Sequence, residues 1–462
     1  MKVKSIIKTS IVILLFVLLI DAIASSFFQS ISNNIHLEID NQNFNKAKLD
    51  SLFIAIEDNR KGMGSISIFR DGDEIYQKSF GYADIDNKIK TTANTKYRIG
   101  SVSKSFTAVI IMKLIEEGKL SLTTKLSDFF PSLPNANEIT IEQLLRHRSG
   151  LFDFTKSIDY VNWMTEPKTR TELLTIIKDN GPVFEPNKKT RYSNTNYVIL
   201  TYIAEDIEGE EFSKIIEKHI TKPLGLKNTY YGDKIHPENF EALSYDNLHP
   251  WKIAKETNSK LAMGAGAIVS NPSDINTFYY KLFKGDILSK ASLDEMRMIV
   301  DNFGIGLMQT FFFDKKVLGH NGAIDGFQTR ALYFPEDNIS LAYMTNAVDM
   351  NVDDIVFGAL SIYYGMNYTI PTFKTEMDSI STDLDQYLGI YVNPDFPLEI
   401  TISRRDDSLI AQATGQPSFI LEPFALHKYK YDPAGFTMEF IPAEKRMILR
   451  QYGGVIEFKI KN

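Results

Sequence analysis

The segment Arg98-Ile99-Gly100-Ser101-Val102-Ser103-Lys104-Ser105-Phe106 carries the strongest chemical signal in this 462-residue chain. It follows a strand-like stretch and opens an apolar run with helical spacing, which predicts a helix over residues 104–117. A three-residue offset places Ser101 and Lys104 one turn apart on the same face of that helix. Ser101 would then lie at the helix N-terminus, where free N–H groups favour developing negative charge.

Lys104 is expected to lie against the apolar body of the predicted helix. Because burial disfavours the charged form of an amine, Lys104 is a candidate proton acceptor at neutral pH. The S-x-x-K tetrapeptide is weak when taken alone, since a chain of this length should contain about two chance matches. Ser5-Ile6-Ile7-Lys8 is such a match. On the tetrapeptide alone, a helix-capping role for Ser101 therefore stays open.

Two further motifs follow along the chain. Arg191-Tyr192-Ser193-Asn194-Thr195-Asn196-Tyr197 contains a Y-x-N tripeptide, and Gly319-His320-Asn321-Gly322-Ala323 contains an H-x-G tripeptide. In this order, the three motifs resemble those of the serine β-lactamase and D,D-peptidase superfamily. The resemblance is to the branch of class C β-lactamases, D-alanyl-D-alanine carboxypeptidases and related esterases. Y-x-N recurs elsewhere in the chain, but the tripeptide at Tyr192 has the surroundings typical of that family.

The resemblance extends over about residues 45–365. Leu144–Leu151 resembles the family's loop after the nucleophile helix, and we expect His147 in this loop to be structural. Gly264–Ser270 resembles its glycine-rich turn, which is expected to border the cleft.

The resemblance implies a role in acyl transfer for the first two motifs. Ser101 is expected to attack a carbonyl and form an acyl-enzyme. Lys104 and Tyr192 are both candidate bases, and the sequence leaves the choice open. A Tyr192 phenolate needs a lowered pKa, which an adjacent Lys104 ammonium would provide. Asn194 is expected to accept a hydrogen bond from Lys104 and to donate one to the substrate carbonyl.

The residues of the third motif are expected to line the substrate-binding site. His320 would hydrogen-bond Tyr192 or a substrate carboxylate, and Gly322 would let the substrate lie against a strand. By analogy with the family, the backbone N–H groups of Ser101 and Ala323 would stabilise the oxyanion.

The third motif also departs from the family pattern. Peptidases and β-lactamases of the family usually carry Thr or Ser at the positions of Asn321 and Ala323, where the hydroxyls hold a substrate carboxylate. His320 replaces the lysine of the β-lactamases, and a neutral imidazole attracts a carboxylate less than an ammonium does. These departures argue against efficient turnover of β-lactams or D-Ala-D-Ala, whereas the acylation residues are intact.

The order of elements predicts an α+β fold, with an antiparallel sheet flanked by helices and a mostly helical subdomain. Alternation over Gly64–Phe69 and Glu74–Gly81, with a turn at Asp71-Gly72, predicts the first hairpin. Four more strands are expected over Ile305–Phe312, Lys316–Gly319, Phe327–Phe334 and Ile339–Thr345. The sheet is expected to join the first and last segments of this domain.

Four regions are expected along the chain. A signal peptide or membrane anchor occupies residues 1–24, and a β-lactamase-like hydrolase domain spans 25–365. A linker over 366–383 leads to a small all-β, barrel-like module at 384–462, for which a sandwich stays open as the alternative. This module resembles the lipocalin-like β module appended to some members of the family. Its predicted strands are Tyr387–Val392, Leu398–Ser403, Leu409–Ala413, Phe419–Leu421, Phe436–Phe440, Met447–Gln451 and Val455–Ile460, with turns at Asp406-Asp407 and Gly453-Gly454.

The N-terminus indicates the compartment. Lys2, Lys4 and Lys8 precede an apolar run over Ile11–Ile20, and Ala22-Ile23-Ala24 offers a cleavage site. This pattern is typical of a secretory signal peptide, with an uncleaved anchor as the alternative. Both interpretations place the rest of the chain outside the cytoplasm.

Composition excludes several classes of function. The net charge of −7 argues against nucleic acid as a partner, because phosphate binding needs a basic surface. The chain has no cysteine, so disulfides, thiolate nucleophiles and Cys-ligated metal sites are excluded. Its seven histidines show no metal-ligand spacing, and no P-loop or dinucleotide fingerprint is present. We expect neither metal nor cofactor.

The sequence thus predicts an extracytoplasmic serine hydrolase that cleaves amide or ester bonds through an acyl-enzyme. Its expected substrates are small molecules or peptides, including D-amino-acid or cell-wall-derived compounds. Two alternatives stay open: a β-lactamase or penicillin-binding protein, and a non-catalytic ligand-binding protein that retains the fold. The sequence does not indicate an oligomeric state.

Overall fold

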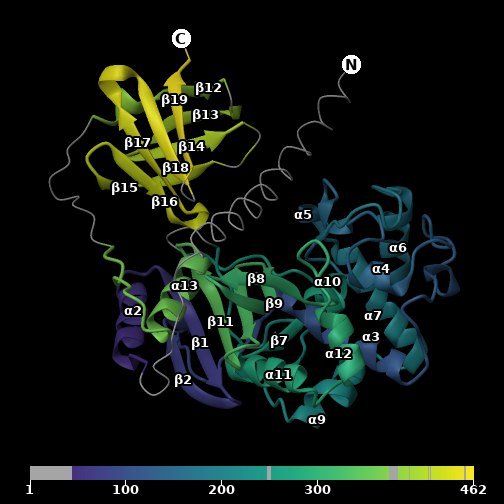
Figure 1. The fold of residues 1–462 in the computed structure, drawn as a ribbon. Helices are drawn as coiled ribbons and strands as arrows, with labels where there is room; N and C mark the ends of the chain where they lie inside the picture. Colours follow the sequence, from purple (N-terminus) through teal and green to yellow (C-terminus); the bar gives the residue numbers. More distant parts are fainter. Residues whose placement is uncertain are drawn as a thin grey trace. The chain divides into compact units, whose positions relative to one another are not determined.

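The computed structural model in Figure 1 describes residues 44–246, 251–373 and 383–461, apart from residues 395, 415, 417, 452 and 453. The chain divides into two compact units, Arg60–Val348 and a second unit formed by Met1–Asn59 with Asp349–Asn462. The expected signal or anchor segment lies outside the described residues, as does the part of the expected linker over 374–382.

The unit Arg60–Val348 is built on a six-stranded antiparallel sheet with the order β2-β1-β11-β10-β9-β8 (Figure 1). β1 pairs with β11, so the sheet joins the first and last segments of the unit, as the sequence predicts. The β1–β2 hairpin turns at Asp71 and Gly72, which both have positive φ. The strands are β1 Gly62–Arg70, β2 Asp73–Phe80, β8 Met308–Phe312, β9 Lys315–Ile324, β10 Phe327–Phe334 and β11 Ile339–Val348.

Two smaller sheets accompany the large one. β3 (Tyr82–Asp84) pairs with β4 (Ile89–Lys90). The three-stranded sheet has the order β5-β7-β6, formed by β5 (Tyr97–Arg98), β7 (Ile268–Ser270) and β6 (Tyr230–Tyr231). β5 is the strand-like stretch that precedes Ser101.

Helix α3 (Ser103–Glu116) confirms the predicted helix after Ser101 and is the most buried helix of the unit. It packs against α7 (Asn194–Glu208) and α10 (Ser259–Gly266), while α11 (Pro272–Lys284) packs on strands β1, β10 and β11. The ring of Phe106 stacks on Phe278 with centroids 3.9 Å apart. The other α-helices of the unit are α4 Ile141–Leu145, α5 Tyr160–Trp163, α6 Arg170–Asp179, α8 Phe212–Ile216, α9 Lys222–Leu224 and α12 Lys290–Arg297.

Two of the strand boundaries that differ from the predictions bear on the site. The strand expected from Ile305 begins at Met308, because Gly306 has a φ of 65° and its backbone packs against α3. A Cβ at Gly306 would lie 2.3 Å from the Cβ of Ala108. β9 runs beyond the expected end at Gly319 and includes the whole third motif, which is paired with β10.

In the second unit, the C-terminal residues form a closed eight-stranded barrel, which confirms the predicted all-β module. The strands are β12 Gly389–Asn393, β13 Phe396–Arg405, β14 Ser408–Ala413, β15 Phe419–Ala425, β16 Lys428–Tyr431, β17 Phe436–Ile441, β18 Arg446–Gln451 and β19 Gly454–Ile460. β16, which has four residues, two of them lysines, was not predicted from the sequence. Buried aromatic side chains, among them Tyr387, Phe440 and Phe458, fill the barrel core.

The same unit contains α2 (Lys46–Asp58) and α13 (Val352–Tyr363). Of the helices in the described part of the chain, none combines the length and the apolar character that crossing a bilayer requires.

Candidate active site

Ser101 lies where a strand turns sharply into a helix. β5 ends at Arg98, a 3₁₀ turn spans Gly100–Val102, and α3 begins at Ser103. Gly100 has a φ of 53°, a backbone conformation that glycine adopts without a steric penalty. The nucleophile candidate therefore lies at the positive end of a long buried helix, as the sequence predicts.

Lys104 is fully buried and its amine contacts Ser101 directly. Its Nζ lies 3.0 Å from Ser101 Oγ, 2.8 Å from Asn194 Oδ1 and 2.8 Å from the carbonyl oxygen of Ala265. The amide and carbonyl oxygens can only accept hydrogen bonds. A neutral Lys104 amine would use its two N–H groups on these acceptors and direct its lone pair at the Ser101 hydroxyl.

The electrostatics favour that neutral form. Burial lowers the pKa of Lys104 to about 7, although the carboxylate of Asp153 acts in the opposite direction. At neutral pH, a large fraction of Lys104 is thus able to accept a proton.

Asn194 is the first residue of α7, and its side chain is held from two sides. Its Oδ1 accepts from Lys104, while its Nδ2 donates to Thr155 Oγ1 at 3.1 Å and to Asp153 Oδ2 at 3.4 Å. The backbone N–H of Asn194 also donates to Asp153 Oδ2 at 3.3 Å. The predicted bond from Lys104 is present, but the predicted donor to substrate, Nδ2, is already used by protein acceptors.

Tyr192 lies in the site, but its pKa is raised, whereas a role as phenolate would need a lowered pKa. The Lys104 Nζ lies 4.8 Å from the centre of the Tyr192 ring, and the Tyr192 hydroxyl hydrogen-bonds the Ser101 side chain. Burial raises the pKa of Tyr192 well above its ordinary range despite that bond. A Tyr192 phenolate, one of the two candidate bases, is therefore disfavoured, because the cost of burying its negative charge outweighs the hydrogen bond with Ser101.

His320 lies in the site with a different hydrogen bond from those predicted. Its ring is 6.2 Å from that of Tyr192, centre to centre, and its Nδ1–H donates to the carbonyl oxygen of Asn321 at 2.6 Å. Burial lowers the pKa of His320 to about 3, and Lys104 contributes to this shift. His320 is thus neutral, with its Nε2 as the acceptor nitrogen.

The third motif approaches the nucleophile backbone to backbone. A Cβ on Gly322 would lie 1.9 Å from the carbonyl oxygen of Ile99 and 3.3 Å from the Ser101 nitrogen. A Cβ on Gly100 would lie 2.7 Å from the Ala323 nitrogen. The N–H groups predicted for the oxyanion site, those of Ser101 and Ala323, therefore belong to two segments in direct contact.

The loop at His147 holds the segment that carries Tyr192. His147 is buried, its Nδ1 accepts from the Ser193 N–H at 3.1 Å, and its carbonyl oxygen accepts from the Arg191 N–H at 2.9 Å. Its ring lies 4.4 Å from that of Tyr192, centre to centre. These contacts agree with the structural role expected for His147.

The glycine-rich segment contributes backbone, as expected, but lies within α10. The helix is kinked at Met263, with a φ of 39°, and the kink precedes the Ala265 carbonyl that accepts from Lys104. A Cβ at Gly264 would lie 2.4 Å from the hydroxyls of Thr107 in α3 and Thr201 in α7, so α10 packs closely against both helices.

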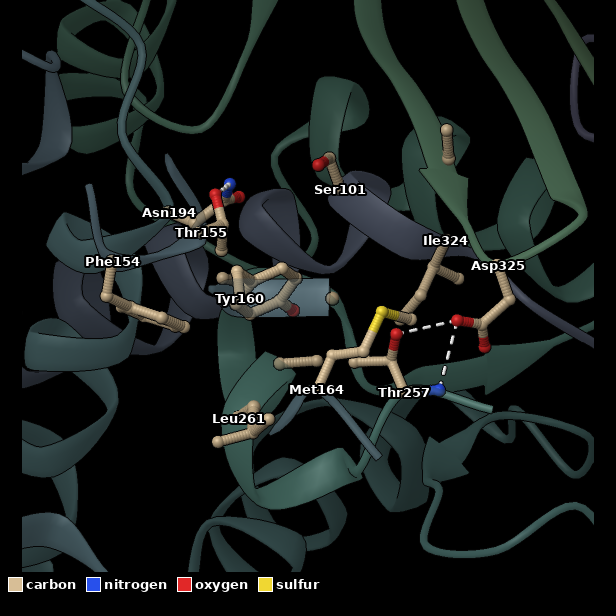
Figure 2. A pocket seen from close by; sticks show the side chains of 14 residues that line it. Ser101, Phe154, Thr155, Tyr160, Met164, Asn194, Thr257, Leu261, Ile324 and Asp325 are labelled. Carbon is tan, nitrogen blue, oxygen red and sulfur yellow. Dashed lines mark hydrogen bonds between the residues drawn. The ribbon is translucent and has the colours of Figure 1, made fainter. Parts of the chain in front are cut away.

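A pocket of about 260 Å³ opens beside Ser101 (Figure 2). Apolar side chains line much of it, and the sequence analysis did not single out its polar members other than Ser101 and Asn194. The described residues that line it are Ser101, Phe154, Thr155, Tyr160, Met164, Asn194, Thr257, Leu261, Ala262, Ala265, Gly266, Ala323, Ile324 and Asp325. Among the residues the structure describes, no group of three or more His, Asp or Glu side chains is placed to hold a metal ion.

With this geometry established, comparison with known proteins identifies the family. The family model described as Beta-lactamase matches residues 49–356, more than half of the chain. The chain belongs to the β-lactamase family. The predicted superfamily, α+β fold and class of β-lactamase-related serine hydrolase are thereby confirmed.

Two curated members of this family illustrate the range of its relatives. The chain is 26% identical to penicillin-binding protein 4* of Bacillus subtilis over 443 residues, which cover 88% of this chain and 97% of that protein. It is 27% identical to a teichoic acid D-alanine hydrolase of Staphylococcus aureus over 230 residues, 48% of this chain and 56% of that protein. The chain thus spans about half the length of the second relative.

Solved structures of the family are similar as well. D-amino acid amidase from Ochrobactrum anthropi SV3 superposes with a TM-score of 0.62 at 28% identity, covering 69% of this chain and 99% of that one. A penicillin-binding protein homologue from Pyrococcus abyssi gives a TM-score of 0.64 at 25% identity, covering 90% of this chain and 97% of that one.

Proposed function

We propose that this β-lactamase family member is an extracytoplasmic hydrolase that cleaves amide or ester bonds through an acyl-enzyme on Ser101. The contact between Lys104 Nζ and Ser101 Oγ, at 3.0 Å, carries the proposal. The amine is buried, its pKa is lowered to about 7, and its other contacts are acceptors. This arrangement activates a serine hydroxyl.

Acylation begins when Lys104 takes the Ser101 proton and Oγ attacks the substrate carbonyl. The N–H groups of Ser101 and Ala323 stabilise the oxyanion that forms. Because its pKa is raised, Tyr192 stays protonated after the attack. As Tyr192 passes its proton to the leaving amine or alcohol, the Lys104 ammonium replaces that proton in the same step, so that no buried phenolate forms. Water hydrolyses the ester by the reverse sequence, and Ser101 recovers its proton.

The substrate is an amide or ester of a small acyl group, with D-amino-acid derivatives as the first class to test. Two similar proteins are named for such chemistry, the teichoic acid D-alanine hydrolase and the D-amino acid amidase. The neutral His320, with Asn321 and Ala323 beside it, offers little attraction for the carboxylate of a β-lactam or a D-Ala-D-Ala peptide.

A penicillin-binding protein is the second candidate, because similarity to penicillin-binding protein 4* extends over 88% of this chain. Slow acylation by a fluorescent penicillin without release would favour this function. Hydrolysis of a chromogenic cephalosporin faster than that of simple esters would favour a β-lactamase.

The extracytoplasmic location rests on the sequence of residues 1–24, which predicts a signal peptide or a membrane anchor. Fractionation of cells that express the full chain, with N-terminal sequencing of the product, tests it. A product that starts after Ala24 supports cleavage, a membrane-bound product with an intact N-terminus supports the anchor, and a cytoplasmic product contradicts both.

A fluorophosphonate probe tests the nucleophile. We expect the probe to label the wild-type protein at Ser101 and the Ser101→Ala variant to stay unlabelled. Ser121→Ala, which removes an exposed serine from another loop, is the control and should be labelled like the wild type. Labelling that persists in Ser101→Ala would contradict the proposal.

A further inference from the structure

One end of the pocket carries polar groups that the proposed mechanism does not use. Asp325, Thr257 and Tyr160 form this end, whereas Ser101 and Asn194 belong to the part in which acylation is proposed. Figure 2 shows the Tyr160 ring in the view between Asn194 on one side and Thr257 with Asp325 on the other. We call Asp325, Thr257 and Tyr160 the acidic end of the pocket.

Asp325 is held rigidly in the tight turn between β9 and β10, where Ile324 pairs with Phe327. Its Oδ1 accepts from the Thr257 backbone N–H at 3.0 Å and from Thr257 Oγ1 at 2.6 Å. Its Oδ2 is buried and has no hydrogen-bond partner within the described part of the chain. The carboxylate thus retains capacity to accept hydrogen bonds.

The one carboxylate or cation among the described side chains that line the pocket is negative. Among the described residues that line it there is no Lys, Arg or His, and Asp325 is the single ionisable carboxylate. Burial raises the pKa of Asp325, which reflects the cost of the isolated negative charge. Burial raises the pKa of Tyr160 to about 12, and the carboxylates of Asp325 and Asp153 contribute to the shift, so two carboxylates lie near that hydroxyl.

The charge of the nearby Arg98 acts to lower the pKa of Asp325, but none of the hydrogen bonds that its guanidinium forms within the described part of the chain goes to Asp325, and its Nε has no partner there. The guanidinium donates to the carbonyl oxygen of Thr257 at 2.9 Å, to the carbonyl of Asp233 and to the carboxylate of Glu256. Among the described residues, no cationic side chain therefore donates a hydrogen bond to the Asp325 carboxylate.

Asp325 lies close enough to the proposed oxyanion site to reach an amine on the acyl part of a substrate. Asp325 follows Ala323, whose N–H is proposed to hold the oxyanion, by two residues. Two residues of extended chain span about 7 Å. An amine a few bonds from the reacting carbonyl can bridge that distance together with one hydrogen bond.

We propose that the acidic end binds a positively charged amine on the acyl group of the substrate, with the Asp325 carboxylate as its main acceptor. The apolar wall of Phe154, Met164 and Leu261 would receive the side chain of that acyl group. This inference rests on the proposed function and narrows its substrates to esters and amides of amino acids with a free amino group. Asp325 then acts as the specificity-determining residue.

A matched pair of substrates tests this inference near neutral pH. D-phenylalanine p-nitroanilide carries the free amine, and N-acetyl-D-phenylalanine p-nitroanilide lacks it. p-Nitrophenyl butyrate has no amine at all, so its hydrolysis measures the activity of the Ser101 site without the proposed contact. We expect the wild type to prefer the free amine in kcat/KM by about tenfold or more, the value of a charge-assisted hydrogen bond. Asp325→Asn should remove that preference and leave butyrate hydrolysis within about threefold of the wild type.

Asn can still accept the two bonds from Thr257, so Asp325→Asn is designed to keep the turn. Tyr160→Phe removes a polar atom from the same end, and we expect a smaller loss confined to the free-amine substrate. Asp294→Asn, in which an exposed carboxylate on α12 is replaced, is the control and should behave like the wild type. Protection of wild-type Ser101 from the fluorophosphonate probe by D-phenylalanine amide, but not by its N-acetyl form, would support the inference without any variant.

Other outcomes would overturn the inference. A wild type that hydrolyses p-nitrophenyl butyrate but shows no preference for the free amine would contradict it and leave the proposed function intact. An Asp325→Asn variant that loses activity on both p-nitroanilides equally would also contradict it. A wild type that turns over none of the three substrates and is not labelled at Ser101 would instead contradict the proposed function on which the inference rests.

Discussion

At the scale of single residues, the burial of Lys104 explains why its amine can act as a base. An amine with three close contacts and no access to water loses much of its preference for the charged form. Two of the contacts, with Asn194 and Ala265, are pure acceptors, which leaves Ser101 as the contact that can give up a proton.

The pH dependence of acylation follows from this arrangement. Since the pKa of Lys104 is about 7, the reactive neutral form dominates above that pH and is lost below it. We expect the rate of fluorophosphonate labelling to fall about tenfold per pH unit below the pKa and to level off above it. His320, with a pKa of about 3, does not titrate in this range. A rate that is flat from pH 5.5 to 8 would contradict Lys104 as the base.

Tyr192 is expected to matter for the leaving group more than for attack. In Tyr192→Phe the ring that packs on His147 is kept and the hydroxyl is lost. We expect kcat on an amide to fall about 100-fold or more, and kcat on a p-nitrophenyl ester to fall much less, because p-nitrophenolate leaves without a proton. The control Tyr197→Phe removes a hydroxyl bonded to the Leu145 carbonyl and should spare both activities. Equal losses on both substrates would contradict a proton-donor role.

The sequence predicted the motif residues but not the residues that hold them. Ser101, Lys104, Tyr192 and Asn194 belong to short motifs with characteristic spacing, and the structure brings them together. Asp153 and Thr155 fix Asn194 across some 40 positions of the chain, and no local pattern marks them. Their position just after the Leu144–Leu151 loop was the one available signal.

At the scale of elements, the contact between β9 and the turn before α3 decides whether an oxyanion site exists. Gly322→Ala would place a Cβ 1.9 Å from the Ile99 carbonyl oxygen and push the strand away from Ser101. We expect labelling and hydrolysis to fall about 100-fold or more, as when one oxyanion donor is removed. Gly118→Ala, at a glycine with open space around it, is the control and should affect stability alone. Normal activity in Gly322→Ala would contradict this oxyanion site.

At the N-terminus of α7, one side chain contributes both to the stability of the fold and to the position of Asn194. Asp153 accepts the backbone N–H of Asn194, the first residue of α7, as well as its side chain. We expect Asp153→Ala to lower the free energy of unfolding by about 1–2 kcal/mol and also to lower kcat, because Asn194 loses an anchor. Thr169→Ala, which removes the cap of α6, should cost about 1 kcal/mol without changing kcat. Equal kcat values in the two variants would contradict the anchoring role.

Elements were predictable where hydrophobic periodicity was strong. The first hairpin, α3 and strand β10 follow from alternation or helical spacing, and the structure confirms them. The strand expected from Ile305 was wrong at its start because the Gly306 backbone packs on α3, a long-range contact. β16 was missed because a four-residue strand of alternating Lys and Tyr resembles a loop.

At the scale of the whole molecule, the chain separates into two units, and all the site residues lie in Arg60–Val348. The all-β character of the C-terminal module was predictable from short strands at close spacing. Barrel closure was not, because the pairing of β12 with β19 joins strands at opposite ends of the module. The barrel has its own core of buried aromatic side chains, whose inward orientation the sequence pattern did not specify.

Acyl-enzyme formation on Ser101 can be observed by mass spectrometry of the whole protein, acid-quenched during turnover of an ester or amide substrate. We expect a transient mass increase equal to the acyl group, located on the peptide that contains Ser101. Ser101→Ala should show neither the adduct nor turnover, and Lys104→Met should form the adduct far more slowly. Turnover that survives Ser101→Ala, or an acyl group found on another residue, would contradict Ser101 as the nucleophile.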